Sequence, residues 1–401
     1  MKIVHVFYST IPSAKGGDIR SRDVVECQKE VGMDVCAVSS PFQPPVSAGE
    51  ETESIGGVRY FRTFRCGGGL GISEKDKGLL VKIRKLLTLG KFSRALYEIC
   101  MKEVPDVIHA HSTFYCAAAS YVVSRLVGAK FVYEVRSLWE ERAAMASPTL
   151  KNKIISRLAR FAETVAMRSA DHLVVISNGL REDALARGVR PENITQVGNA
   201  ANLLRVGEVQ PTVTEKAVED WVYGYIGNLS DIEGIDLFIE AVRKLRSEGW
   251  RNSVKIFGGG PAAASLKSMA NDIEDLFFLG AFSPDAAAVA YSNVDIIVNP
   301  RRQSVLTDKV TPLKPLEAMA YRKPVIVSSV AGMLELVEDE RNGFIFKTDD
   351  CDSLVDTFRR VAATKELVLA VEADAYKYVK DCRSWRANGL LYKSMYMTLC
   401  D

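Results

Sequence analysis

The sequence has few of the side chains that build metal centres and disulfide frameworks. Its 401 residues include eight cysteines and four histidines. The cysteines are scattered without a CxxC pair or a metal-like spacing, so neither a metal cluster nor a disulfide framework is predicted. Several cysteines fall inside apolar runs, where a free thiol behaves as a small hydrophobic side chain. The four histidines leave few candidates for metal binding or proton transfer.

Long apolar runs and a strong net charge are also missing. No run approaches the roughly 18 residues of a membrane-spanning helix, and the start, MKIVHVFYSTIP, is too short and too polar for a signal peptide. A net charge of +2 implies no nucleic-acid partner. With 47% hydrophobic and 25% charged residues, the composition is that of an ordinary globular protein. We therefore expect a cytoplasmic protein.

Short apolar runs alternate with helical patterns along most of the chain. In the first half these runs are residues 2–8, 35–38, 58–61, 107–109, 131–135 and 173–176. This alternation is typical of a doubly wound α/β sheet of Rossmann type. A polar segment precedes a second series of strands that begins near residue 221. We predict a first domain at 1–205, a linker at 206–220, a second domain at 221–384 and a final helix at 385–401.

Glycines and a histidine lie at the predicted strand ends of the first domain. Gly16 and Gly17 precede a helix predicted over residues 18–31, where they let the backbone approach a ligand closely. An ordinary turn is the alternative. His111 of DVIHAH is expected just past the carboxyl end of a strand, where ligands of open α/β sheets collect, whereas His109 is expected inside the strand.

The stretch from 295 to 332, DIIVNPRRQSVLTDKVTPLKPLEAMAYRKPVIVSSVAG, organises the second domain. Buried strands are predicted at 296–298 and 324–327, with a polar loop and a short helix between them. The helix should begin near residues 313–315, because proline is tolerated in a first turn. The amides at its start lie among basic side chains and make a ready phosphate site. These basic residues are Arg301, Arg302, Lys309 and Lys314.

The string TPLKPLEAMAYRKPVI resembles the donor-binding segment of the retaining glycosyltransferases of family 4, particularly the sugar transferases of bacterial exopolysaccharide systems. The resemblance implies that Glu317 holds the ribose of a nucleotide sugar. A carboxylate eight residues earlier holds the sugar's hydroxyls in that family, but here Lys309 occupies this place, so the role passes to the nearest acid, Asp308. It also implies donor contacts for the residues before the helix, Thr311, Pro312, Leu313 and Lys314.

Two basic residues of that family are replaced in this sequence. Family members carry arginine after a loop glycine and lysine before the next glycine, whereas Asn228 follows Gly227 here and Glu233 holds the second place. We expect the four basic residues of the 295–332 stretch to compensate. Gly259 belongs to a GGGP turn where the family's base-binding region begins. This turn is not GxGxxG, so a dinucleotide cofactor is not predicted.

The resemblance extends to the first domain. It implies that His111 orients the donor sugar, that the glycine pair faces the diphosphate, and that Glu134 and Arg136 of YEVRSLWEE lie on the acceptor side. A salt bridge in a solvated loop is an equal alternative for Glu134 and Arg136. Residues 75–102 carry eight basic and two acidic residues opposite leucines at helical spacing. Such a helix either contacts an anionic membrane surface or packs as an ordinary surface helix.

Nearly the whole chain takes part in the resemblance, which implies the GT-B fold. In that fold two Rossmann-like domains face each other across a cleft, and the last helix crosses back to the first domain. The implied activity is retaining transfer of a sugar from a nucleoside diphosphate sugar, most often of UDP or GDP, to a carbohydrate acceptor, without a metal or other cofactor. The alternatives are a non-catalytic binding protein of the same fold and a synthase of a small phosphosugar or disaccharide.

Overall fold

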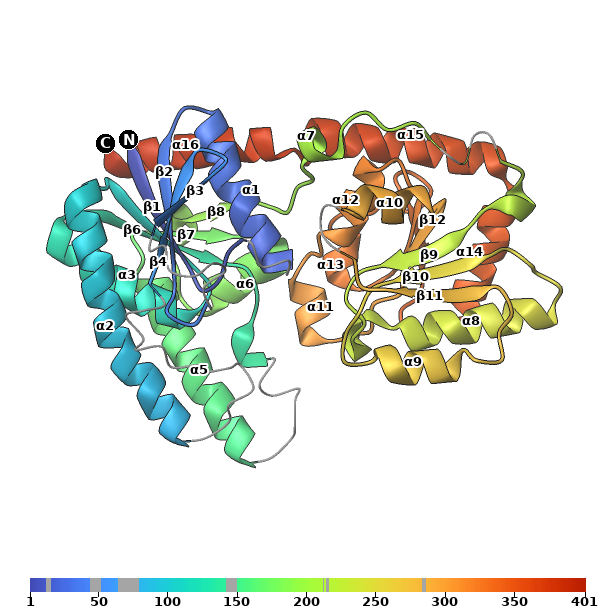
Figure 1. The fold of residues 1–401 in the computed structure, drawn as a ribbon, viewed down its shortest axis with the longest axis horizontal. Helices are drawn as coiled ribbons and strands as arrows, with labels where there is room; N and C mark the ends of the chain where they lie inside the picture. The colour runs from blue at the N-terminus through green and yellow to red at the C-terminus, as the bar shows by residue number, and fades with distance from the viewer. Residues whose placement is uncertain are drawn as a thin grey trace. The chain divides into compact units, whose positions relative to one another are not determined.

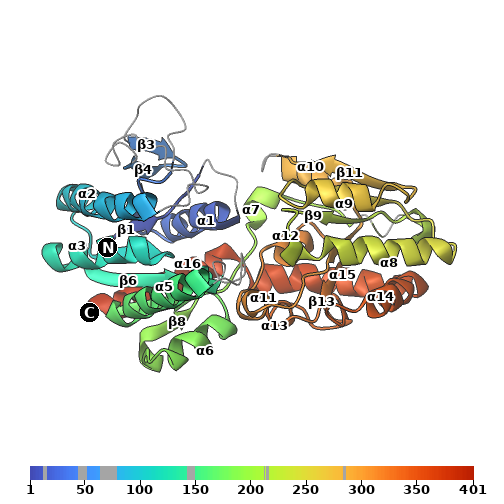
Figure 2. The ribbon, with the colours of Figure 1, turned by 90° about the horizontal axis from the view of Figure 1, so that it is seen from below.

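The chain forms two compact units, Met1–Gly198 with Trp385–Asp401, and Asn199–Ser384. Figures 1 and 2 show the computed structural model in two views. It describes residues 1–11, 16–43, 52–63, 79–141, 150–211, 213, 216–282 and 286–401, and for residues 16, 79–86, 150 and 151 it describes the backbone alone.

The first unit is built on an eight-stranded sheet of order β3-β4-β2-β1-β5-β6-β7-β8. All neighbouring strands are parallel except β3, which is antiparallel to β4. The central strands are almost fully buried, as in parallel sheets covered on both faces. The strands are β1 (Lys2–Phe7), β2 (Asp34–Ser39), β3 (Thr52–Ile55), β4 (Val58–Arg62), β5 (Val107–His111), β6 (Lys130–Val135), β7 (His172–Val175) and β8 (Ile194–Gln196).

Helices cover both faces of this sheet. On one face α3 packs against both α2 and α5, and on the other α16 packs along α1 (Figure 1). The predicted return of the last helix to the first domain is therefore confirmed. The helices of the first unit are α1 (Gly16–Glu30), α2 (Leu79–Glu103), α3 (Phe114–Val127), α5 (Leu150–Ser169), α6 (Asn178–Ala186), η2 (Pro191–Asn193) and α16 (Trp385–Cys400).

Strand alternation sends neighbouring side chains of β6 to opposite helical layers. Tyr133 faces α5, where its hydroxyl donates to Glu163 at 2.6 Å. Glu134 faces α1 and α16, where it accepts from Arg20 at 3.2 Å and from Tyr392 at 2.5 Å. The second of these layers thus carries a polar cluster under the sheet, which is described below.

The second unit is built on a six-stranded parallel sheet of order β11-β10-β9-β12-β13-β14. Its strands are β9 (Tyr223–Ile226), β10 (Val254–Phe257), β11 (Leu276–Gly280), β12 (Ile296–Asn299), β13 (Val325–Ser328) and β14 (Phe344–Phe346). Its helices are α7 (Leu203–Val206), η3 (Val218–Asp220), η4 (Asp231–Glu233), α8 (Ile235–Ser247), α9 (Ala263–Met269), α10 (Ala287–Ser292), α11 (Val305–Lys309), α12 (Lys314–Ala320), α13 (Ala331–Leu334), α14 (Cys351–Ala363) and α15 (Lys365–Cys382).

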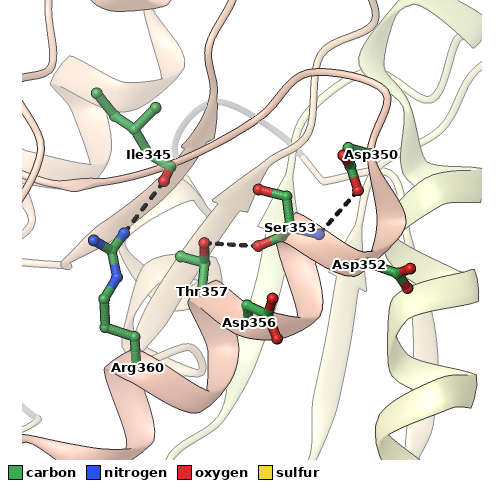
Figure 3. A pocket seen from close by; sticks show the side chains of 7 residues that line it. All are labelled: Ile345, Asp350, Asp352, Ser353, Asp356, Thr357 and Arg360. Atoms are coloured by element: carbon green, nitrogen blue, oxygen red, sulfur yellow. Dashed lines mark hydrogen bonds between the residues drawn. The ribbon is translucent and has the colours of Figure 1, made fainter.

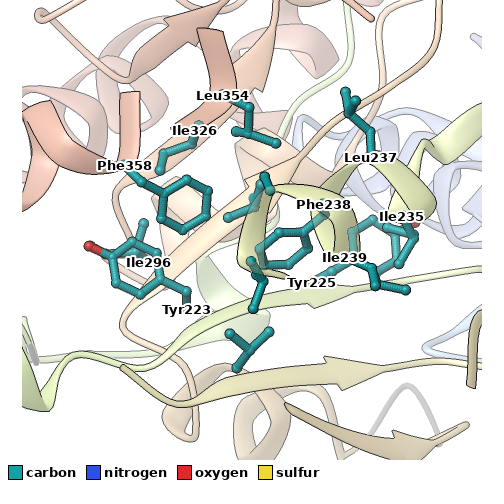
Figure 4. Close-up of a cluster of buried hydrophobic side chains, with 14 of the residues drawn as sticks. Tyr223, Tyr225, Ile235, Leu237, Phe238, Ile239, Ile296, Ile326, Leu354 and Phe358 are labelled. Atoms are coloured by element: carbon teal, nitrogen blue, oxygen red, sulfur yellow. The ribbon is translucent and has the colours of Figure 1, made fainter. Parts of the chain in front are cut away.

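An apolar core joins α8 and α14 to one face of the second sheet. Figure 4 shows Phe238 of α8 and Phe358 of α14 packed over strand residues that include Tyr223 and Ile296. The Phe358 ring centroid lies 4.8 Å from that of Tyr223 and 5.9 Å from that of Phe238. Burying a side chain of this size stabilises the fold by about 1.5–3 kcal/mol. The alternating strand residues, such as Ile297, face a second core formed with α10, α12 and α15.

The structure changes the predicted status of residues 199–220. Val213, inside the predicted linker, is fully buried in the core of the second unit. Ala201, assigned to the first domain by the sequence, pairs with Ser384 in a short bridge and donates its N–H to the carbonyl of Arg383 at 3.0 Å. These described residues pack with the second unit because they bury apolar surface and backbone groups there, so the boundary lies at Gly198 and not at residue 205.

Candidate functional site

The predicted strand–loop–helix–strand of the second unit is confirmed, except that the loop contains an additional short helix, α11. α11 and α12 lie between β12 and β13, and α11 begins at a capping box in which Ser304 and Thr307 exchange hydrogen bonds. α12 starts at Lys314 with Pro315 in its first turn, and it buries Leu316, Met319 and Ala320. The polar loop before α12 is thereby held at the carboxyl end of β12.

Glycine at the end of β9 lets a lysine approach the sheet. Gly227 has φ 151°, and a Cβ there would lie 2.3 Å from Cε of Lys314. Gly258 of the GGGP turn has φ 150° and makes room for the Gly227 carbonyl, which would lie 1.8 Å from a Cβ. The N–H of Leu229 donates to the Gly259 carbonyl at 2.9 Å. The two glycine turns are thus locked together, and any side chain at Gly227 would displace Lys314.

Lys314, Glu233 and Arg301 form a group that we call the charge cluster, in which Glu233 and Arg301 are buried and the Lys314 side chain is 20% exposed. Nζ of Lys314 lies 2.7 Å from Oε1 of Glu233, and Nε of Arg301 lies 3.7 Å from Oε2. Burial opposes the ionisation of Glu233, but Lys314 and Arg301 outweigh it and lower the pKa of the carboxyl. Burial also lowers the pKa of Lys314 although Glu233 favours its charged form. Two cations around one carboxylate leave one positive charge.

Several buried polar atoms of this region have no hydrogen-bond partner among the described residues. They are Nε and Nη1 of Arg301, Oε2 of Glu233 and both side-chain amide atoms of Asn299, at the end of β12. Asn299 is 1% exposed. Buried polar groups are nearly always hydrogen-bonded, because an unsatisfied group keeps its full desolvation cost. The open donors of Arg301 and Asn299, beside a net positive charge, fit an anionic ligand, and the open acceptor oxygens of Glu233 and Asn299 fit a ligand hydroxyl.

Glu317 and Thr311 stand at the two ends of the same turn. The half-buried Glu317 hydrogen-bonds the hydroxyl of Tyr291, whose pKa is raised well above its usual value by burial and by this carboxylate. The carbonyl of Thr311 accepts from Nδ2 of Asn199 at 2.7 Å, and its Oγ1 lies 3.3 Å from the same nitrogen. Asn199 therefore fixes the loop before α12. Pro312 and Leu313 complete that loop and are half-buried.

Other residues predicted to bind the donor have protein partners of their own. Arg302 pairs with Asp236 and, at 3.0 Å, with Asp349. Asp308 accepts from Nε2 of Gln303 at 2.5 Å and from the N–H of Ala331 at 3.2 Å. The structure therefore joins Arg301, and not Arg302, to Lys314.

Two further donor residues predicted from the sequence lie on either side of this turn. Lys309 ends α11 and is half-buried. The carbonyl of Asn228 accepts from the Tyr225 hydroxyl at 2.8 Å, and the Tyr225 ring centroid lies 5.3 Å from Nζ of Lys314. Asn228 thus lies beside the charge cluster.

The predicted site residues of the first unit lie in a buried network. His111 is the last residue of β5, so the expectation that it follows the strand is wrong by one residue. It is 1% exposed, its Nδ1 lies 2.7 Å from Nη2 of Arg136, and its Nε2 lies 2.9 Å from Nδ1 of His5. Glu134 is fully buried and accepts from Nε of Arg136 at 2.7 Å. The three predicted residues are therefore in contact, and the ion pair is not a solvated one.

The hydrogen bonds of this network run in one direction from Arg136 to His109. Arginine is only a donor, so Nδ1 of His111 accepts and its Nε2 donates to His5. His5 then donates through Nε2 to Gln28 at 2.9 Å, and Gln28 lies 3.3 Å from the Tyr396 hydroxyl. That hydroxyl lies 2.5 Å from Nδ1 of His109. Nε2 of His109 faces Glu134 at 3.6 Å without a hydrogen bond, and Glu134 accepts from Arg136. We call this loop the histidine ring.

The three imidazoles of the histidine ring are uncharged near neutral pH. Burial lowers the pKa of His5 to about 4, and it holds the pKa of His109 and His111 well below the usual range. The three rings offer nitrogens within 4.8 Å of one another, the spacing of a candidate metal site. His5 and His111 use these nitrogens in hydrogen bonds, however, and His109 uses one of its two. The arrangement therefore fits a hydrogen-bonded network better than a metal site.

Two predicted features of the first unit lie at the edge of the described chain or beyond it. Gly16 and Gly17 open α1, and the carbonyl of Gly17 lies 3.4 Å from Nη1 of Arg136. The loop before them, residues 12–15, lies outside the described residues. In the basic stretch 75–102, residues 75–78 and the side chains of 79–86 also lie outside them.

A surface pocket at the start of α14 contains none of the predicted site residues. Figure 3 shows its lining, in which Asp350 accepts from the Ser353 N–H at 3.0 Å and Thr357 donates to the Ser353 carbonyl at 2.9 Å. Arg360 donates to the carbonyl of Ile345 at 3.2 Å. These polar groups already satisfy one another, so the pocket is a feature of the α14 cap and not a candidate for the reaction.

Sequence reasoning missed several residues of both clusters. His5, Arg20, Gln28 and the tyrosines of α16 join the histidine ring from opposite ends of the chain, so no local motif contains them. A histidine in the middle of the first apolar strand was the available signal. In the second unit the missed residue is Asn299, a polar residue at the end of the buried β12.

Two α/β units, each built on a parallel or almost parallel sheet, and a last helix that returns to the first unit are the features of the GT-B class of glycosyltransferases. Comparison with protein families supports this class: residues 15–200 match the "Glycosyl transferase 4-like domain" model, and residues 221–364 match the "Glycosyl transferases group 1" model. The chain belongs to this family of glycosyltransferases and is a transferase enzyme.

Similar proteins and structures agree with this assignment. The chain is 24% identical over 281 residues to alpha-D-kanosaminyltransferase of Streptomyces kanamyceticus, covering 66% of this chain and 70% of the relative. It is 23% identical over 355 residues to the putative colanic acid biosynthesis glycosyl transferase WcaI of Escherichia coli, covering 82% and 84%. Sucrose-phosphate synthase of Thermosynechococcus elongatus shares the fold with a TM-score of 0.77 at 18% identity, covering 100% of this chain and 99% of that one.

A solved structure with a bound nucleotide has the same fold. Anabaena HepE in complex with UDP superposes with a TM-score of 0.70 at 15% identity, covering 99% of this chain and 100% of that one. Among the described residues, no helix has both the length and the apolar character to cross a membrane.

Proposed function

We propose that the chain transfers a glycosyl group from a nucleoside diphosphate sugar to a glycan, lipid-linked or small-molecule acceptor. The transfer retains the anomeric configuration and needs no bound metal ion. The observation that carries this proposal is the charge cluster, which holds one net positive charge beside the loop before α12. α12 has only seven residues, so the diphosphate charge is met chiefly by Lys314 and Arg301 and less by the helix dipole.

The proposed roles follow from these positions. Lys314, Arg301 and the amides near Thr311 hold the diphosphate, and Glu317 accepts hydrogen bonds from the ribose. Asp308 and His111 keep the roles expected from the sequence, the first for the sugar's hydroxyls and the second for its orientation. Glu134 and Arg136 are proposed for the acceptor side, where they would act by positioning His111, to which Arg136 donates.

The chemistry requires stabilisation of a leaving group. The bond between the anomeric carbon and the phosphate oxygen breaks, and the bond to the acceptor oxygen forms on the same face of the sugar. The acceptor's proton passes to the departing phosphate oxygen, so no side-chain base is required. Negative charge develops on the diphosphate as it leaves, and fixed cations in a buried setting stabilise that charge more strongly than water does.

The relatives suggest the biological setting of this reaction. One is named for colanic acid biosynthesis and another as an alpha-1,3-galactosyltransferase acting on a diphosphoundecaprenol-linked sugar. HepE was solved with UDP and with UDP-glucose. We therefore propose polysaccharide or glycoconjugate biosynthesis, with a UDP or GDP sugar as donor.

A donor panel tests the proposal. The purified chain is incubated with UDP-, GDP-, ADP- and TDP-sugars, with lipid-linked, oligosaccharide and phosphosugar acceptors, and release of nucleoside diphosphate is measured. Proton NMR of the product determines the anomeric configuration, and a parallel reaction with EDTA tests for metal dependence. We expect turnover with one class of donor, an unchanged anomer and no loss with EDTA. An inverted product, or a loss restored by added metal, would contradict the corresponding part of the proposal, and binding without turnover would leave only a binding role.

We also propose that residues 75–102 contact an anionic membrane surface. From Leu87 onward, where side chains are described, Leu87 and Met101 are 69% and 56% exposed. Lys91 and Lys102 are exposed on the same helix. Binding to vesicles should then require anionic lipid and weaken with salt. Equal recovery in the soluble fraction with neutral and anionic vesicles at low salt would make α2 an ordinary surface helix.

A further inference from the structure

A second helix of the first unit exposes an apolar face. On α5 the residues Ile154, Leu158, Phe161 and Val165 are 51%, 64%, 69% and 48% exposed. With 3.6 residues per turn, these four positions fall within about 60° of one another around the helix axis. Large apolar side chains on a surface helix normally face the core, so this stripe is the reverse of the usual arrangement. We call it the α5 stripe.

The buried side of α5 is anchored separately. Glu163, on the opposite side of the helix, is 2% exposed and accepts from the Tyr133 hydroxyl at 2.6 Å and from the N–H of Phe114 at 2.9 Å. Met167 is buried on the same side. The orientation of α5 is therefore fixed by these contacts, and its apolar stripe is left pointing outward.

Basic side chains accompany the stripe. Arg157 and Arg168 are exposed along one edge of it, with Lys153 and Arg160 further round the helix. Arg160 lies 3.7 Å from Glu141 and 3.7 Å from Asp183, so its charge is partly balanced. The sequence of α5 contains one acidic residue, Glu163, and that residue is turned inward. The exposed surface of α5 thus combines large apolar groups with positive charge.

A neighbouring helix also exposes apolar side chains. α3 packs against α5, and it exposes Val122 and Leu126 at 50% and 65%. α2 packs against α3 on the other side, so the three helices form one layer on the same face of the sheet (Figure 1). An acidic protein groove would complement the charges but requires a matching shape, whereas a lipid surface accepts a flat stripe with basic edges.

We propose that the α5 stripe docks on an anionic lipid bilayer. Its apolar residues enter the boundary between headgroups and acyl chains, and Arg157 and Arg168 contact the lipid phosphates. This extends the proposed membrane contact of residues 75–102 to a different helix. It concerns where the enzyme lies and leaves its donor chemistry unchanged.

The test is flotation of the full-length chain with two kinds of vesicle, phosphatidylcholine alone and phosphatidylcholine with phosphatidylglycerol. We expect binding to the anionic vesicles at low salt. The double variant Leu158→Ser/Phe161→Ser should bind about tenfold more weakly, because each substitution removes apolar surface that would otherwise enter the bilayer. Arg157→Gln/Arg168→Gln should lose about fivefold per residue, corresponding to about 1 kcal/mol each.

Controls separate this proposal from its rivals. Leu204→Ser removes an 82% exposed leucine from α7 of the second unit and should bind as the wild type does. Lys91→Gln/Lys102→Gln reports on α2, and donor hydrolysis without acceptor should be equal in all variants. Light scattering after gel filtration identifies a self-association surface. The proposal would be overturned if the α5 substitutions left vesicle binding unchanged. It would also be overturned by a dimer that the double serine variant converts to a monomer.

Discussion

Each unit surrounds one buried carboxylate with two cations, but only in the first unit are both carboxylate oxygens hydrogen-bonded. Glu134 accepts from Arg20, Arg136 and Tyr392 at 3.2, 2.7 and 2.5 Å. Glu233 has Lys314 at 2.7 Å and Arg301 at 3.7 Å, and its Oε2 has no hydrogen-bond partner among the described residues. Around Glu134 and the histidine ring, only Nε2 of His109 lacks a hydrogen-bond partner among the described residues, whereas the second cluster leaves several donors and acceptors open.

This difference distinguishes the two clusters as candidates for the diphosphate site. A fully satisfied buried network rigidifies the structure, whereas an incompletely satisfied one retains a desolvation cost. A ligand that supplies the missing partners removes that cost on binding. The open charge cluster is therefore the better candidate for binding the diphosphate, and the histidine ring chiefly holds β1, β5 and β6 against α1 and α16, which keeps His111 in its proposed position.

Glu134→Gln should have the largest effect. The substitution leaves the guanidinium groups of Arg20 and Arg136 buried without a counter-charge, so we expect the free energy of unfolding to fall by about 3–5 kcal/mol. Glu233→Gln should cost much less, because the Lys314 side chain is 20% exposed and reaches solvent. Denaturant unfolding, with hydrogen exchange of peptides from each unit, measures both changes. Equal losses in the two variants would remove the distinction between closed and open clusters.

Acidification should weaken the first unit selectively. Burial depresses the pKa of His5 from 6.5 to about 4, so the unfolded chain binds a proton at a higher pH than the folded chain does. The stability contributed by neutral His5 is present above pH 6.5 and is lost as the pH falls towards 4, by up to about 3 kcal/mol. His109 and His111, with pKa values lowered by burial, add to the same trend.

Hydrogen exchange at several pH values, corrected for the intrinsic exchange rate, measures this loss of stability separately in each unit. Peptides of β1 and β5 should lose protection between pH 6.5 and 4, while peptides of β9 and β12 should not. His5→Gln serves as the control, because it removes the titrating ring and should reduce the pH dependence. Loss of protection at the same pH in both units would show that the histidine ring does not govern acid stability.

Lys314→Ala tests the open cluster directly. We expect it to lower the affinity for a nucleoside diphosphate by about 2 kcal/mol and to leave nucleoside binding nearly unchanged, because charge-assisted hydrogen bonds contribute about 1.5–3 kcal/mol. Arg301→Ala should act in the same direction but less strongly. Lys347→Ala, which removes a lysine side chain that is 77% exposed, is the matched control. Calorimetry that finds equal losses for both ligands would place the phosphate elsewhere.

The strand pattern and the 295–332 stretch were predictable because their signals are local. Apolar runs bounded by glycine and proline marked β12 and β13, and Pro315 marked the start of α12. The partner of Lys314 was not predictable in this way, because Glu233 lies 81 positions earlier and meets it only when β9 and β12 pair. The sequence identified Glu233 as a lost cation, whereas the structure shows it pairing with the lysine that compensates for the loss.

The histidine ring shows the same limit more strongly. Its members come from β1, α1, β5, β6 and α16, and Tyr396 joins His109 across 287 positions. Periodicity could place His111 at a strand end, but it could not show that both ring nitrogens are occupied. The last helix is buried against α1 by tertiary packing. The environment of every histidine in the ring depends on this packing.

Glu317→Gln should have a smaller effect on nucleotide affinity than Lys314→Ala. A carboxylate accepts stronger hydrogen bonds from a ribose diol than a neutral amide does, and we expect about a tenfold loss. Because Tyr291 hydrogen-bonds Glu317, Tyr291→Phe is the control for a displaced side chain. A folded Glu317→Gln protein that binds nucleoside and nucleoside diphosphate as the wild type does would remove Glu317 from the ribose site.

Arg302→Ala should change nucleotide affinity least, and it brings the comparison inside the second unit. Arg301 and Arg302 are adjacent in sequence, yet Arg301 has unsatisfied nitrogens while Arg302 is paired with Asp236 and Asp349. Partly exposed pairs of this kind contribute about 0–1 kcal/mol to stability. A guanidinium that already donates to two carboxylates has few N–H groups available for a phosphate. We therefore expect a change in nucleoside diphosphate affinity below about 0.5 kcal/mol. Calorimetry of the two alanine variants side by side tests this. If Arg302→Ala lowers the nucleoside diphosphate affinity as much as Arg301→Ala does, the unsatisfied nitrogens of Arg301 do not mark the phosphate site.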